Sequence, residues 1–274
     1  MQLNHICKNV NLYKTMDIEQ ALVCARLSQA IYLPLNDFHN QLRDEYPGCR
    51  VQIFQRDGCE CACLCLPKEK KTILIFRGTE FSTSNDFLAN MDVVRDQDPL
   101  LGKVYVHSGF LAELKDVWKQ LYTFVDTHAR PHYHQLFVTG HSLGGALALL
   151  CSARLSSCFI MKVDTYSFGA PMVGGSTFLE LFDHTPNWDH YRCEYNNDIV
   201  PKLKTLRVLG YDHVGTKVYF NYTGDIILRE LTWKERWRDW IVGHWQAVTH
   251  MQLFDSLKDH RITKYVQILD QNIM

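Results

Sequence analysis

Apolar and polar positions along the chain follow two periods, one near 3.6 residues and one of 2, which are typical of helices and strands. A helical pattern begins at a capping signal formed by Asp17 and Gln20 and ends before Pro34. A longer amphipathic helix is predicted over residues 110–125. Strand-like runs surround these helices, at residues 51–54, 59–66, 72–76, 136–139, 162–168, 191–195 and 217–222.

This alternation of helices and strands predicts an α/β fold. Residues 72–76 are apolar on both faces, so this strand is expected in the interior of the sheet. Helices that connect parallel strands pack on both sides of a sheet, which gives a three-layer α/β sandwich with a mostly parallel central sheet. No linker-like tract or internal repeat divides the 274 residues, so we expect residues 1–274 to form a single domain.

Composition narrows the class of partner. The chain is 46% hydrophobic and 22% charged, with a formal net charge of −1, which gives no electrostatic basis for binding nucleic acid. The N-terminus lacks the apolar region of a secretory signal. The sequence also has no run of about 18 apolar residues, the length that is needed to span a bilayer. We therefore expect a cytoplasmic protein with a neutral or amphipathic substrate, while export by a route without a signal stays open.

The ten cysteines are scattered through apolar segments. Cys59, Cys61, Cys63 and Cys65 occupy every second position, so they share one face of a strand, about 6.6–7 Å apart along it. That separation lies near the upper limit for a disulfide, and the spacing lacks the C-x-x-C turn that wraps a zinc ion. We expect reduced thiols in the core, no metal site, and a reducing compartment.

A serine between glycines is the strongest chemical signal in the chain. The apolar strand at 136–139 runs into Gly140-His141-Ser142-Leu143-Gly144 and then into a helix of small residues. This arrangement is typical of a nucleophile elbow, because the sharp turn leaves no room for a Cβ two residues before or after the serine. The pattern predicts that Ser142 is a nucleophile and that the backbone N–H of Leu143 binds the oxyanion.

A serine hydroxyl needs a base to deprotonate it and an acid that orients the base. Asp198 follows the strand at 191–195 and enters a loop limited by proline, which suits the acid, although a turn-forming aspartate has the same signature. The base is expected after the last strand, where His244, His250 and His260 occur. Spacing alone leaves both His250 and His260 open.

Several motifs, taken in order, resemble those of the fungal-type, class 3 lipases of the α/β-hydrolase fold. They lie between residues 70 and 265, and their joint order is more specific than any one of them. In chain order they are Phe76-Arg77-Gly78-Thr79, Val106-His107-Ser108-Gly109-Phe110, Gly140-His141-Ser142-Leu143-Gly144-Gly145, Ser167-Phe168-Gly169-Ala170-Pro171-Met172-Val173-Gly174, Asn197-Asp198-Ile199-Val200-Pro201, and Asp259-His260 with Tyr265 downstream.

The resemblance implies a catalytic triad of Ser142, Asp198 and His260, and it favours His260 over His250. It also assigns Thr79 to the oxyanion hole beside Leu143. The implied activity is that of a serine carboxylester hydrolase that cleaves acyl esters of glycerolipids, with no cofactor or metal. Phospholipase A1 or lysophospholipase activity stays open, as does a catalytically silent lipid-binding or interaction protein.

Two amphipathic segments are candidates for contact with lipid. The resemblance places a mobile lid at residues 81–94, where a fixed core helix is the alternative. A second segment, residues 232–245, carries a tryptophan stripe between basic residues, which suits peripheral contact with a membrane or packing over the acyl pocket. The candidate lid and substrate contacts are Phe81, Phe87, Leu88 and Met91, and the stripe consists of Trp233, Trp237, Trp240 and Ile241.

Overall fold

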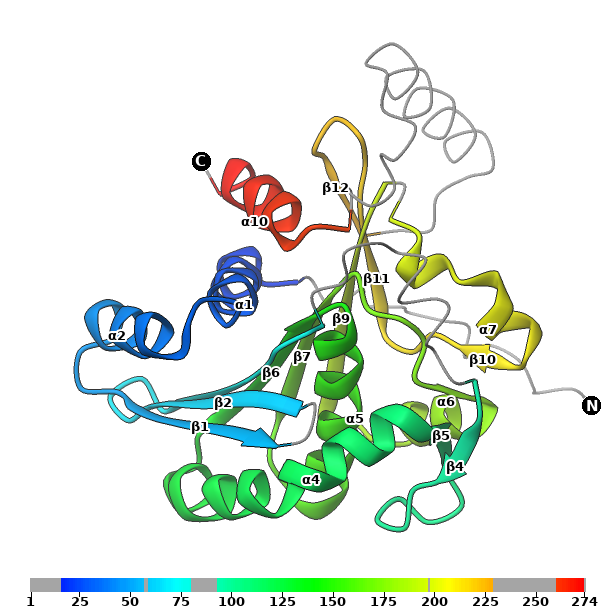
Figure 1. Ribbon diagram of the computed structural model, residues 1–274, viewed down its shortest axis with the longest axis horizontal. Coiled ribbons are helices and arrows are strands. Elements are labelled where there is room, and N and C mark those ends of the chain that lie inside the picture. Colours follow the sequence, from blue (N-terminus) through cyan, green and yellow to red (C-terminus); the bar gives the residue numbers. More distant parts are fainter. Residues whose placement is uncertain (1–15, 57–58, 80–92, 197, 229–259, 274) are drawn as a thin grey trace, which may run out of the picture.

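The structure, a computed structural model, describes residues 16–56, 59–79, 93–196, 198–228 and 260–273. Its centre is an eight-stranded sheet in the order β1-β2-β3-β6-β7-β9-β11-β12 (Figure 1). These strands are β1 (Arg50–Arg56), β2 (Cys59–Leu66), β3 (Lys71–Phe76), β6 (Gln135–His141), β7 (Val163–Phe168), β9 (Trp188–Tyr195), β11 (Thr216–Phe220) and β12 (Ile226–Ile227).

The sheet is mixed, with a parallel centre. Strands β3, β6, β7, β9 and β11 pair in parallel, while β1, β2 and β12 join antiparallel at the two sides. The prediction of a mostly parallel sheet is confirmed. Strand β3 lies between β2 and β6, as its apolar residues on both faces indicated.

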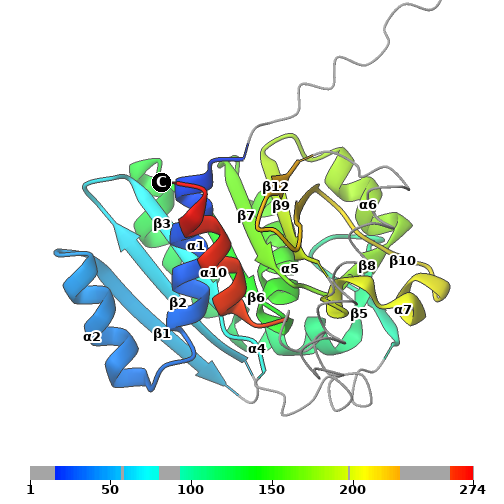
Figure 2. The ribbon, with the colours of Figure 1, turned by 90° about the horizontal axis from the view of Figure 1, so that it is seen from above.

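Helices cover both faces of the sheet, as Figure 2 shows. Helices α1 (Ile18–Ala30) and α10 (Ile262–Gln271) lie side by side on one face. Helices α4 (Ser108–Phe124) and α5 (Leu143–Cys158) pack on the other. The three-layer α/β sandwich that the sequence predicted is therefore present.

Only one half of the predicted capping box forms at the start of α1. The Asp17 carboxylate accepts a hydrogen bond from the backbone N–H of Gln20 at 3.0 Å. The Gln20 side chain does not complete a reciprocal capping box, because its carbonyl oxygen accepts from Lys71 Nζ at 2.9 Å. Helix α1 is thus attached to the first residue of β3 as well as capped.

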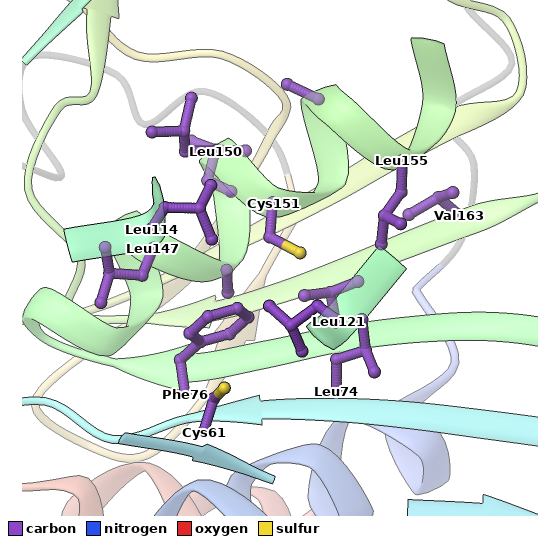
Figure 3. Packing of buried hydrophobic residues seen from close by; sticks show 14 of the residues in the cluster. Cys61, Leu74, Phe76, Leu114, Leu121, Leu147, Leu150, Cys151, Leu155 and Val163 are labelled. Atoms are coloured by element: carbon purple, nitrogen blue, oxygen red, sulfur yellow. The ribbon is translucent and has the colours of Figure 1, made fainter. Parts of the chain in front are cut away.

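The cysteine strand packs as its period predicted. Cys59, Cys61, Cys63 and Cys65 are all buried on the face covered by α4 and α5, whereas Ala62 and Leu64 between them face α1 and α10. Figure 3 shows Cys61 in this core together with Cys151 of α5. All four thiols are free, and burial raises the pKa of Cys63 well above its usual value, so the thiol is protonated and packs as a small apolar group.

Several elements were not predicted from the sequence. The two apolar residues Phe38 and Leu42, one helical turn apart and buried, were the available signal for α2. The strands of a second sheet, in the order β10-β8-β5-β4, have two or three residues each, which is too short to establish a period. These elements are α2 (Leu35–Glu45), β4 (Arg95–Gln97), β5 (Tyr105–His107), β8 (Gly174–Gly175), α6 (Ser176–Asp183), α7 (Lys204–Val208) and β10 (Tyr211–Asp212).

Both candidate lipid-contact segments lie outside the described residues. Of the candidate lid, the structure describes Val93 and Val94, whose exposed fractions are 38% and 53%. The named lid residues Phe81, Phe87 and Leu88, as well as Met91, fall in the part that is not described, as does all of residues 232–245. Among the described helices, none combines the length and apolar character needed to cross a bilayer.

Candidate active site

Ser142 occupies a strained turn between β6 and α5. Its backbone angles are φ 57° and ψ −128°, a combination that residues with a side chain rarely adopt. A Cβ on Gly140 would lie 2.3 Å from the backbone of Gly144, which explains the glycines around the serine. The backbone N–H of Ser142 donates to the carbonyl oxygen of Phe168 at 2.9 Å and attaches the turn to β7.

The structure brings Ser142, Asp198 and His260 into one hydrogen-bonded relay. His260 Nε2 lies 2.8 Å from Ser142 Oγ, and His260 Nδ1 lies 2.9 and 3.0 Å from the two carboxylate oxygens of Asp198. These are the distances that deprotonation of a serine by histidine requires. The alternatives His244 and His250 lie outside the described residues.

Asp198 is fully buried and receives further hydrogen bonds besides that of His260. The Tyr265 hydroxyl donates to its Oδ2 at 2.6 Å, and the backbone N–H of Val200 donates to its Oδ1 at 3.0 Å. Burial, followed by the charge of Asp198, raises the pKa of Tyr265 well above its usual value, so the phenol stays protonated. The sequence motif includes Tyr265 but indicates no role for it, because the distance between Tyr265 and Asp198 depends on how α10 packs.

Gly169 provides the space in which the acid and the base meet. Its φ is +60°, and a Cβ there would lie 2.6 Å from Asp198 Oδ2 and 3.1 Å from His260. Any side chain at this position would separate the two groups, and the positive φ would be strained besides. The glycine after β7 is therefore part of the geometry of the relay.

The two candidate oxyanion donors are on segments that pack closely together. A Cβ on Gly144 would lie 2.3 Å from the carbonyl oxygen of Phe76 and 2.9 Å from the nitrogen of Gly78. The end of β3 thus passes directly over the first turn of α5, and Thr79 follows, exposed. Leu143 is the first residue of α5, where backbone N–H groups have no partner within the helix.

No group of three or more histidine, cysteine or acidic side chains within the described part of the chain is arranged to hold a metal ion.

Fold and site together define a class: an α/β sandwich with a serine, histidine and aspartate relay at the carboxyl edge of its sheet. The sequence profile of the family described as Lipase (class 3) matches residues 73–208. The chain belongs to this class 3 lipase family. The matched segment contains Ser142 and Asp198 but ends before His260.

Curated relatives are lipases of fungi, among others. The chain is 31% identical over 156 residues to a lipase of Rhizomucor miehei, covering 55% of this chain and 42% of that protein. It is 30% identical over 151 residues to a secreted mono- and diacylglycerol lipase A of Penicillium cyclopium, covering 54% of this chain and 47% of that protein. The chain thus spans less than half the length of these relatives.

Solved structures agree on the fold. Lipase II from Rhizopus niveus superposes with a TM-score of 0.63 at 23% identity, covering 74% of this chain and 80% of that one. A triacylglycerol lipase described as having a serine protease triad at its catalytic centre superposes with a TM-score of 0.60 at 25% identity, with the same two coverages, 74% and 80%.

Proposed function

We propose that this protein is a serine carboxylester hydrolase, a lipase that cleaves acyl esters of glycerolipids. One observation carries the proposal: a single imidazole, that of His260, lies within hydrogen-bond distance of both Ser142 Oγ and the buried Asp198 carboxylate. The names of the fungal relatives, which include mono- and diacylglycerol lipases, support the glycerolipid substrate.

The geometry supports a two-step acyl transfer. His260 Nε2 accepts the Ser142 proton as Oγ attacks the ester carbonyl, and Asp198 stabilises the imidazolium that forms. The backbone N–H of Leu143 and the N–H or hydroxyl of Thr79 donate to the oxyanion, and such fixed donors contribute about 3–4 kcal/mol each. The imidazolium then protonates the leaving alcohol, and a water molecule repeats the sequence on the acyl-enzyme.

The test combines covalent labelling with a substrate panel. A fluorophosphonate probe should label the protein, and Ser142→Ala should abolish both labelling and hydrolysis. Ser152→Ala is the matched control, because Ser152 is a buried serine of α5 whose Oγ donates to the carbonyl oxygen of Ala148 at 2.8 Å. A folded wild-type protein that neither reacts with the probe nor releases fatty acid would overturn the proposal and favour a silent lipid-binding protein.

The substrate panel should contain mono-, di- and triacylglycerols beside phospholipids and lysophospholipids. We expect the released fatty acid to come mainly from the glycerides. Release mainly from the phospholipids would indicate a phospholipase A1 or a lysophospholipase that uses the same residues, Ser142, Asp198 and His260.

We also propose that residues 81–94 contact the lipid surface, on the basis of their apolar helical spacing alone. The double variant Phe87→Ser with Leu88→Ser should lower activity on aggregated lipid more than activity on a soluble short-chain ester. Equal losses on the two substrates would contradict a lid role.

A further inference from the structure

A second imidazole, that of His141, packs against His260 and has no role in the reaction described above. Its ring centroid lies 4.7 Å from that of His260, and the residue is 7% exposed. His141 is the last residue of β6 and directly precedes Ser142. Both of its ring nitrogens have partners, because Nε2 lies 2.5 Å from the backbone carbonyl oxygen of His260 and Nδ1 lies 3.1 Å from the Tyr32 hydroxyl.

The partners determine where the protons are. A carbonyl oxygen only accepts, so His141 Nε2 must carry a proton. Burial, followed by the proximity of His260, lowers the pKa of His141 well below its usual value, so the ring is neutral and Nδ1 has a free lone pair. The Tyr32 hydroxyl therefore donates to His141, and His141 donates to the carbonyl of His260.

Tyr32 is itself held in place by neighbouring segments. The Arg77 guanidinium lies 5.5 Å from the centroid of the Tyr32 ring and pairs with Glu60 at 3.4 Å. A Cβ on Gly78 would lie 2.5 Å from the Tyr32 hydroxyl, so the glycine leaves the space that this hydroxyl occupies. The chain that follows α1 thus presents a fixed donor to His141.

On the basis of the proposed hydrolase function, we propose that His141 is a positioning residue whose Nε2–H fixes the backbone of His260, and that Tyr32 keeps His141 in the donating tautomer. His260 lies outside α10, which begins at Ile262, so no helical hydrogen bond holds its carbonyl. A displacement of about 1 Å at a catalytic group costs on the order of 100-fold in rate. Anchoring this carbonyl keeps the imidazole between Ser142 and Asp198.

The neutral state of His141 also favours proton transfer to His260. When His260 accepts the serine proton, a second positive charge on the neighbouring His141 ring would oppose it. The groups that face His141 are His260, the Tyr32 hydroxyl and the Tyr265 ring, whose centroid is 6.3 Å away. Arg77 lies behind the Tyr32 ring, where its guanidinium pairs with the Glu60 carboxylate.

The kinetic test uses two substitutions with different donors. His141→Leu removes the N–H donor and should lower kcat on a soluble short-chain ester about 30-fold, with KM changed less than about 3-fold. His141→Gln retains an N–H group at a similar distance and should restore kcat to within about 5-fold of wild type. Active sites are counted by exhaustive fluorophosphonate titration, so that loss of folded protein does not enter kcat.

His190 provides the matched control. It is also a buried imidazole with one nitrogen on a hydroxyl, Ser167 Oγ at 2.8 Å, and the other on a backbone carbonyl, that of Val214 at 3.0 Å. His190→Leu should reduce stability as His141→Leu does, yet leave kcat per titrated site within about 2-fold of wild type. If His141→Leu has no larger effect on kcat than His190→Leu, or if His141→Gln restores nothing, the proposal is wrong.

A spectroscopic measurement separates this inference from the hydrolase proposal. Nitrogen-15 spectra of the histidine rings in Ser142→Ala need no turnover, and they should show His141 as the neutral Nε2–H tautomer between about pH 5 and pH 8. Tyr32→Phe should shift the Nδ1 resonance of His141. An active enzyme whose His141 is an imidazolium or an Nδ1–H tautomer would refute the inference alone, whereas an unreactive Ser142 would refute the hydrolase proposal.

Discussion

Asp98 and Asp198 are both fully buried in the described part of the chain, and the groups that bind their carboxylates differ in kind. Asp98 is paired with Arg154, whose Nε and a terminal nitrogen lie 2.8 and 3.3 Å from its oxygens. Asp198 has Tyr265, a backbone N–H and His260, none of which is a fixed cation. A fixed cation neutralises a buried charge permanently, while neutral donors leave that charge available to stabilise an imidazolium.

The two carboxylates should differ most in their effect on kcat, which a substitution of Asp198 should lower far more than a substitution of Asp98. Asp198→Asn removes the charge but keeps the shape, and the amide favours the wrong tautomer of His260. We expect kcat to fall about 10⁴-fold, measured on a soluble ester at saturating concentration. Asp98→Asn, assayed in parallel per titrated site, should stay within a few-fold of wild type, and an equal loss in both variants would remove the distinction.

For the free energy of unfolding, in contrast to kcat, we expect the larger effect at the Asp98–Arg154 pair. Arg154→Met leaves Asp98 charged and buried without its partner, which costs about 3–5 kcal/mol in the free energy of unfolding. Urea unfolding of the variant and of wild type measures the difference. A variant as stable as wild type would show that Asp98 is stabilised by its other contacts, such as the backbone N–H of Leu100 at 2.9 Å.

Removing one neutral donor should have an intermediate effect. Tyr265→Phe deletes the hydroxyl that donates to Asp198 while keeping the buried ring, and a hydrogen bond to a charged group contributes about 1.5–3 kcal/mol. We expect kcat/KM to fall roughly 10-fold, in line with the loss of about 1.4 kcal/mol of orientation and charge stabilisation. If the pH–rate profile and kcat are both unchanged, Tyr265 has only a packing role.

Glu113 of α4 extends the comparison to a carboxyl with an unsatisfied oxygen. Within the described residues its Oε2 is buried without a hydrogen-bond partner, and burial, followed by the charge of Asp116, raises its pKa to about 7. A folded-state pKa above the unfolded value means that stability is lost as pH rises from about 4.5 to about 7.

Glu113→Gln should therefore be more stable than wild type at pH 8, by about 1 kcal/mol after allowance for its partial exposure to solvent. The two proteins should converge below about pH 4, where the wild-type carboxyl is largely protonated in both states. Thermal unfolding at several pH values measures the difference. A pH-independent difference would show that the titration of Glu113 is not its cause.

Features of the site could be predicted from the sequence where the residues that form them lie close together along the chain. The elbow was predictable because its requirements are local: an apolar strand, glycines at two fixed offsets and a small-residue helix lie within residues 136–150. The acid and the base were harder, because spacing alone left His250 open beside His260. Their assignment came from a resemblance in the order of motifs, and the geometry that joins them came from the structure.

The amino-acid sequence by itself determined the α/β layering, the sharing of one strand face by four cysteines and the tight turn at the serine, since periodicity and glycine placement act through neighbouring residues. Only the tertiary structure decided which partners the buried groups find. The Tyr265 hydroxyl reaches Asp198, and Tyr32 reaches His141, across separations of 67 and 109 residues. Such hydrogen bonds depend on angles and distances of a few tenths of an ångström, which follow from how α1 and α10 pack on the sheet and have no periodic signature in the chain.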